Sequence, residues 1–201
     1  MKVHTLKMIP VTIAFMLICA IIVLLHYVIF QQPDFSHESV ILFGALDQEL
    51  INKGQIWRLL TYAFGHMSTI HFLINLPILF ILSRSLERLF GSFKFFLFLI
   101  LTSISGGVLF YFFYEGSIPI SGSSGPIFGF IGILTFLTVR YFDRISANDK
   151  RFTVIMLLIG TVSTFFIPSV AISVHLGGFF GGVLVAFIDS LFRLEKVQAT
   201  K

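Results

Sequence analysis

A serine and a histidine stand out because each lies in a strongly apolar part of the chain. Ser124 comes two residues after Gly122 and directly before Gly125, and His175 lies inside the apolar run 170–191. A serine hydroxyl becomes a nucleophile when a neighbouring base takes its proton, and imidazole is the side chain best suited to that task near neutral pH. These residue types predict nucleophilic catalysis, with Ser124 as nucleophile and His175 as general base.

Hydrogen-bond donors for such a reaction are also present. His71 and Asn75 are four residues apart, so on a helix they share one face. Ser124 is expected at a helix N-terminus, where main-chain N–H groups are free to bind a developing oxyanion, and Gly122 and Gly125 allow close approach of the backbone. His71 and Asn75 are candidates for the remaining hydrogen bonds.

The elements that position these residues are expected to be membrane helices. Of the 201 residues 56% are hydrophobic and only 12% are charged, the mean hydropathy is +0.95, and 26 residues are Phe. A helix needs about 20 apolar residues to cross the hydrocarbon core. The sequence predicts an all-α, polytopic membrane protein, one membrane domain over residues 1–201, with spans near 9–30, 69–86, 93–114, 124–141, 152–168 and 170–191.

The basic residues predict the orientation of these spans. With the N-terminus inside, 12 of the 14 Lys and Arg residues fall on the inner side, and only Lys53 and Arg58 fall outside. Cytoplasmic segments are enriched in Lys and Arg, so both termini are predicted to be cytoplasmic. Ser124, His71 and Asn75 then lie at the outer ends of their spans, and His175 lies roughly 7–8 Å deeper than the start of its span.

Other polar residues have simpler interpretations. The long connection 31–68 is expected at the membrane interface, with Trp57 and Arg58 as headgroup-level anchors, and Arg84 and Glu87 are expected to form an ion pair within one helix. His66 is expected to hydrogen-bond inside this first loop. No metal is predicted, because the spacing of His66 and His71 does not place ligands on one helix face.

Small residues also have a structural interpretation. The G-x-x-x-G pairs Gly125–Gly129 and Gly178–Gly182 are typical of closely packed membrane helices. Close approach of spans 4 and 6 at these glycines would also bring His175 near Ser124. The net charge of +4 has a topological explanation and no basic, aromatic-rich polar segment is present, so a nucleic-acid partner is not expected.

Five short motifs resemble those of the rhomboid family of intramembrane serine proteases, and they occur in that family's order over residues 54–182. They are the G-x-S-G of Gly122–Gly125, the H-x-x-x-N of His71–Asn75, the H-x-x-G-x-x-x-G of His175, Gly178 and Gly182, the W-R pair Trp57–Arg58, and the E-x-x-x-G of Glu87 and Gly91. Two positions depart from the family pattern. Phe128 replaces a common Tyr expected beneath the catalytic imidazole, and Ser83 replaces the first Gly of the second-span motif.

The resemblance implies a six-helix bundle that hydrolyses peptide bonds in or near transmembrane segments through an acyl-enzyme, with a Ser124–His175 dyad and no cofactor. It implies an oxyanion site made by the Ser124 backbone, His71 and Asn75. Transmembrane substrates would enter from the bilayer beside the fifth span, under a cap near 168–173. The location expected by analogy is a bacterial plasma membrane, and no oligomeric state is predicted. The alternative is a catalytically inactive relative that binds membrane proteins without cutting them.

Overall fold

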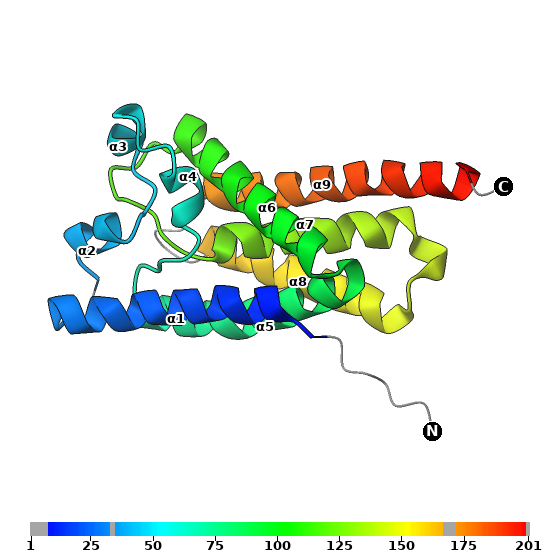
Figure 1. Ribbon diagram of the computed structural model, residues 1–201, viewed down its shortest axis with the longest axis horizontal. Coiled ribbons are helices and arrows are strands. Elements are labelled where there is room, and N and C mark those ends of the chain that lie inside the picture. Colours follow the sequence, from blue (N-terminus) through cyan, green and yellow to red (C-terminus); the bar gives the residue numbers. More distant parts are fainter. Residues whose placement is uncertain (1–7, 33–34, 167–171, 200–201) are drawn as a thin grey trace, which may run out of the picture.

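The structure of the chain, a computed structural model, describes residues 8–32, 35–166 and 172–199 (Figure 1). Over these ranges the chain is helical apart from loops and one isolated bridge between Leu46 and Ile120. The long helices are α1 (Pro10–Phe30), α5 (Thr69–Phe90), α6 (Ser92–Phe113), α7 (Ser124–Arg140), α8 (Ala147–Phe166) and α9 (Ile172–Ala199). The short helices are α2 (His37–Leu42), α3 (Gln48–Asn52), α4 (Arg58–Thr61) and the 3-10 helix η1 (Phe142–Arg144).

The long helices correspond to the six apolar runs predicted from the sequence, with shifted ends. The largest shift at a helix start is in α8, which begins five residues before the predicted span. Ser146 explains this start, because its Oγ accepts a hydrogen bond from the backbone N–H of Asp149 at 3.1 Å and so caps the first turn. The predicted hairpin at Pro168–Ser169 and most of the expected cap lie outside the described residues.

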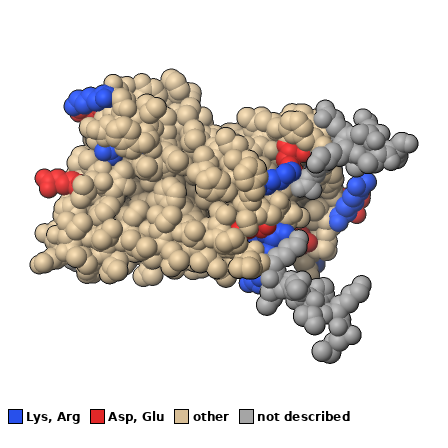
Figure 2. All heavy atoms as spheres, in the orientation of Figure 1, with Lys and Arg blue, Asp and Glu red and all other residues tan. Residues whose placement is uncertain are grey.

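The surface of the bundle is suited to a membrane. Four of the described helices are long and apolar enough to cross one, namely α1, α5, α6 and the Ile172–Phe192 part of α9, whereas α7 has 17 residues and α8 has a charged first turn. Figure 2 shows charged side chains near the two ends of the visible face, with a broad uncharged band between them. The chain is therefore a multi-pass membrane protein. Crossing by all six helices and cytoplasmic termini stay predictions.

Helix α9 packs chiefly against α6 and α7, and glycines permit this contact. A Cβ atom at Gly178 would collide with the carbonyl oxygen of Gly125, and one at Gly182 would collide with that of Gly129. The two backbones therefore meet directly, so the predicted close packing of these helices is confirmed. The Gly125–Gly178 contact lies within one turn of Ser124 on α7 and of His175 on α9.

Glu87 connects α5 to the beginning of α1, side by side with it in Figure 1. Its carboxylate accepts hydrogen bonds from the backbone N–H groups of Val11 at 3.0 Å and Thr12 at 2.8 Å. The predicted ion pair of Glu87 with Arg84 is wrong, and the guanidinium of Arg84 lies over the Phe80 ring instead. The first N–H groups of a helix have no partner within it. The buried Glu87 carboxylate satisfies two of these groups and so stabilises the beginning of α1.

The first loop is held together by Arg58, which is only 6% exposed. Its guanidinium donates hydrogen bonds to the carbonyl oxygens of Ile41 at 3.1 Å and Ala45 at 2.8 Å, and its Nε donates to Gln55 Oε1 at 2.8 Å. The prediction that Arg58 is an interfacial anchor is therefore wrong. Trp57 has 56% of its surface exposed, as an anchor would.

Candidate active site

The segment before Ser124 is held in place by Tyr62 of the first loop. The carbonyl oxygen of Tyr62 accepts hydrogen bonds from Gly122 N and Ser121 Oγ, both at 3.0 Å. The phenol of this fully buried residue donates to the carbonyl of Ser103 on α6 at 2.9 Å. Tyr62 therefore connects the loop before Ser124 to α6 in the interior of the bundle. No sequence pattern predicted Tyr62 as a site residue.

Ser124 is the first residue of α7 and is partly exposed, whereas the neighbouring Ser123 is completely buried. Ser123 Oγ lies 3.2 Å from Nε2 of His66, which is 2% exposed, and burial lowers the pKa of His66 to about 3. His66 thus joins the first loop to the loop before Ser124, residues 114–123, which we call the serine loop. The prediction that His66 hydrogen-bonds inside the first loop is wrong. Of the two adjacent serines, Ser124 is the one that a substrate can reach.

His175 lies on α9 and is held on two sides. Its ring is stacked on that of Phe128, with centroids 3.9 Å apart and planes inclined by 14°. Its Nδ1 lies 2.9 Å from Oγ1 of Thr164 on α8. Phe128 was predicted beneath this imidazole from the sequence, whereas Thr164 was not predicted. The available signal for Thr164 was a polar residue near the end of the fifth apolar run, at a depth similar to that predicted for His175.

Ser124 and His175 are adjacent across the α7–α9 contact. Gly125 follows Ser124, its carbonyl touches Gly178, and Gly178 lies one turn after His175. Although both residues are described, the structure contains no hydrogen bond between Ser124 Oγ and His175. Hydrogen bonds between catalytic groups are often long before substrate binds. The arrangement brings the two predicted residues onto facing turns, with Nε2 of the imidazole left for the serine.

His71 is brought to the same place from α5. A Cβ atom at Gly122 would lie 2.7 Å from Cε1 and 3.3 Å from Nε2 of His71, so the imidazole packs against the serine loop. Nδ1 of His71 accepts a long hydrogen bond, 3.5 Å, from the backbone N–H of Met67, which leaves the proton on Nε2. His71 can therefore act as a donor on the side facing the serine loop.

Asn75 lies one turn further along α5 and is 8% exposed. Its Nδ2 donates to the carbonyl oxygen of His71 at 2.9 Å, so the amide is engaged within its own helix. A change of its side-chain torsions would be needed before Asn75 could donate to an oxyanion. Within the described part of the chain, no three His, Cys, Asp or Glu side chains form a metal-binding group.

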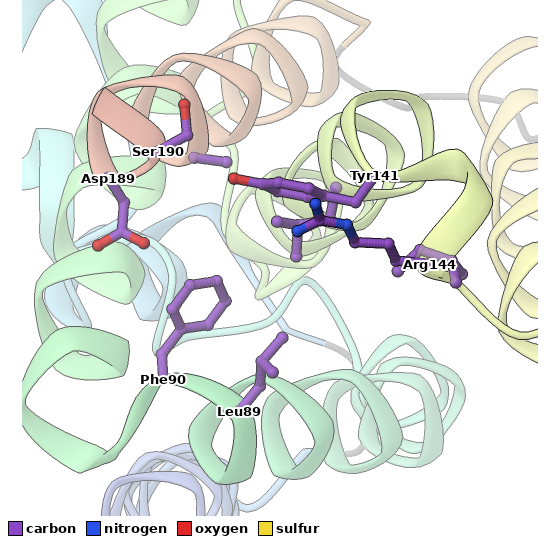
Figure 3. Close-up of a pocket in the computed structure, with 9 residues that line it drawn as sticks. Leu89, Phe90, Tyr141, Arg144, Asp189 and Ser190 are labelled. Atoms are coloured by element: carbon purple, nitrogen blue, oxygen red, sulfur yellow. The ribbon is translucent and has the colours of Figure 1, made fainter. Parts of the chain in front are cut away.

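A pocket of about 200 Å³ lies at the other end of α7, between the ends of α5, α7 and α9 (Figure 3). Tyr141, Arg144, Asp189 and Ser190 line it together with apolar side chains such as Phe90. Roughly 20 Å of helix separates Ser124 from this pocket, which is therefore not part of the serine site.

One match with a known protein family identifies the family of this chain. The Rhomboid domain family model matches residues 53–192. The chain belongs to the rhomboid family. The match includes every residue proposed above for the site, from Tyr62 to Gly182.

Rhomboid relatives occur in bacteria and plants. Rhomboid protease GluP of Bacillus subtilis is 29% identical over 149 residues, which are 74% of this chain and 29% of that protein. Rhomboid protease GlpG of Haemophilus influenzae is 27% identical over 173 residues, 84% of this chain and 87% of that protein. RHOMBOID-like protein 1 of Arabidopsis thaliana is 30% identical over 162 residues, 79% of this chain and 41% of that protein. The chain thus spans less than half of two of these relatives and most of the third.

Proposed function

We propose that this rhomboid protein is an intramembrane serine endopeptidase that cleaves transmembrane proteins through an acyl-enzyme on Ser124. The observation that carries this proposal is the pairing of a partly exposed serine at a helix N-terminus with an imidazole on the facing helix. His175 is 6% exposed and is oriented by Phe128 and Thr164. A merely structural serine has no need of such a partner.

The reaction follows from these groups. His175 Nε2 takes the proton of Ser124 Oγ as the oxygen attacks the scissile carbonyl. The oxyanion accepts hydrogen bonds from the Ser124 N–H, from His71 Nε2–H and, after rotation of its side chain, from Asn75. The imidazolium then gives its proton to the leaving amine, and water hydrolyses the ester with His175 again acting as base.

The substrate class follows from the position of the site. The dyad lies within helices whose outer surfaces expose large apolar side chains, so a substrate arriving from the bilayer fits better than a soluble peptide. Two relatives carry the name rhomboid protease, which supports the same activity for the single membrane domain of this chain. We place this activity in a bacterial plasma membrane, with substrate entering beside α8.

The second candidate is an inactive membrane-protein-binding rhomboid. The lack of a hydrogen bond between the described residues Ser124 and His175 is the observation in its favour, and the names of the rhomboid-like relatives do not specify an activity. A client-binding protein would retain the helix bundle but would not need a serine that reacts.

The test uses purified protein in detergent with a model transmembrane substrate. The chain is expected to cleave it, and Ser124→Ala and His175→Ala are each expected to abolish cleavage. Ser85→Ala and His37→Ala are matched controls, because both residues are exposed and far from the dyad in sequence. Thermal unfolding of each variant checks that the bundle is intact.

Two results would contradict the mechanism. Cleavage that persists in either dyad variant excludes that residue as nucleophile or base. If the unaltered protein neither cleaves nor reacts at Ser124 with a fluorophosphonate, while it still captures the transmembrane substrate, the client-binding function replaces the protease.

A further inference from the structure

Thr164 on α8 makes two hydrogen bonds with the same oxygen. Its Oγ1 lies 2.8 Å from the carbonyl oxygen of Gly160, one turn earlier, and 2.9 Å from Nδ1 of His175. The residue is 6% exposed, so water does not readily replace either partner. Each of the two contacts therefore needs a proton supplied by the protein groups themselves.

The number of protons fixes the direction of both bonds. A threonine hydroxyl carries one proton, and a carbonyl oxygen can only accept. If the hydroxyl proton pointed to His175, the Oγ1 and the Gly160 oxygen would face each other at 2.8 Å with no proton between them. The hydroxyl therefore donates to Gly160, and Oγ1 accepts from the N–H at Nδ1 of His175.

This assignment has a chemical consequence. A neutral imidazole carries one ring proton, so a proton held at Nδ1 leaves the lone pair of Nε2 free. Nε2 is the nitrogen available to Ser124, because Nδ1 is already engaged by Thr164. The alternative tautomer would present an N–H to the serine and could not take its proton.

We propose that Thr164 is a positioning residue that holds His175 in the base-competent tautomer, in place of the acidic third member that this dyad lacks. The inference rests on the proposed function. Phe128 restricts the tilt of the imidazole, and Thr164 restricts its rotation within the ring plane. One turn of α8 supports both restraints. Gly160, at the start of this turn, packs against the Phe128 ring, and Thr164, at its end, contacts His175.

The kinetic test replaces the hydroxyl by a group of the same shape. Thr164→Val is expected to lower kcat by about tenfold, the effect of losing one buried neutral hydrogen bond, with little change in KM. Thr164→Ser keeps the oxygen and should retain most of kcat. Thr135→Val is the matched control, because Thr135 on α7 makes the same bond to the carbonyl one turn earlier, Ile131, at 2.8 Å and has no histidine partner.

A second measurement does not need activity. In protein labelled with ¹⁵N-histidine, the ring nitrogens of His175 distinguish the tautomers, and His175→Gln identifies their signals. At a pH where the ring is neutral, the unaltered protein and Thr164→Ser should show protonated Nδ1 and bare Nε2. Thr164→Val should show a mixture of tautomers, and Thr135→Val should not.

Three outcomes overturn the inference: an Nε2-protonated His175 in the unaltered protein, a Thr164→Val variant with unchanged kcat, or a Thr164→Ser variant as impaired as Thr164→Val. Failure of the proposed function is distinguishable. If the expected tautomer pattern is found in a protein that cleaves nothing, the positioning by Thr164 stands and the protease proposal fails.

Discussion

At the scale of the residue, Phe128 lies flat against the imidazole of His175. The stacked ring also packs against Gly160 of α8, so its position depends on both α8 and α9. Phenylalanine supplies the stacking surface and no hydroxyl, so hydrogen bonding of the imidazole depends on other groups. Thr164 supplies one such hydrogen bond, to Nδ1.

Phe128→Leu should therefore lower the cleavage rate. An aromatic pair is worth about 0.5–1.5 kcal/mol beyond the area it buries, so losing it should reduce kcat roughly 2- to 13-fold through a less ordered imidazole. Phe128→Tyr retains the ring and should stay close to the unaltered protein. The measurement is kcat in the detergent assay, and equal rates for Phe128→Leu and Phe128→Tyr would contradict a role for the ring.

The sequence predicted part of this site. Ser124, His175 and His71 were brought together by residue type, motif and charge-derived depth, and their proximity in the structure follows from that pattern. Thr164 and Tyr62 were missed because the role of Thr164 depends on how α8 is rotated against α9, and that of Tyr62 on how the first loop lies against the loop before Ser124. No spacing along the chain encodes such a contact.

At the scale of the element, the α7–α9 contact sets the distance between Ser124 and His175. The carbonyl groups of one helix touch the glycine Cα atoms of the other, so the contact cannot absorb an added methyl group by a side-chain shift. Gly160 of α8 is different, because a Cβ there would meet the Phe128 ring at 3.1 Å. A ring can move by a few tenths of an ångström more easily than a helix backbone.

Gly178→Ala should therefore destabilise the bundle by about 1–3 kcal/mol, the usual cost of overpacking, and should also reduce cleavage by separating the dyad. Gly160→Ala is the control at a softer contact and should lower the unfolding temperature less. Thermal unfolding in detergent measures both. A Gly178→Ala variant as stable as the unaltered chain would show that α7 and α9 are further apart than described.

The sequence was less informative about what connects elements. The spacing of Arg84 and Glu87 predicted a local ion pair, yet Glu87 binds the first turn of α1, 75 residues away along the chain from Thr12. Arg58 likewise satisfies carbonyl groups of the first loop rather than the membrane interface. In both cases a buried charged side chain hydrogen-bonds to backbone groups that need a partner. The pattern of side chains along the sequence does not show where such backbone groups will lie.

At the scale of the whole molecule, an uncharged band separates two charged ends (Figure 2). The beginning of α1 and the end of α9 lie toward one end of the bundle, and α2, α3 and α4 lie toward the other (Figure 1). This arrangement agrees with the predicted topology, in which the first loop is outside and the basic segments are inside. Helix α7 is the critical element for testing this topology. Its 17 residues extend roughly 25 Å, which is less than the thickness of about 30 Å of the hydrocarbon core.

Cysteine labelling tests whether α7 crosses and in which direction. Ser117 and Asn148 flank α7, are both exposed and carry no charge, so Ser117→Cys and Asn148→Cys leave the distribution of Lys and Arg unchanged. The native Cys19 is completely buried and should stay silent, which the unaltered chain checks. A membrane-impermeant maleimide should label Ser117→Cys in intact cells, and Asn148→Cys only after permeabilisation. Labelling of both in intact cells would mean that α7 does not cross, and the reverse pattern would invert the molecule and place the dyad in the cytoplasmic half of the membrane.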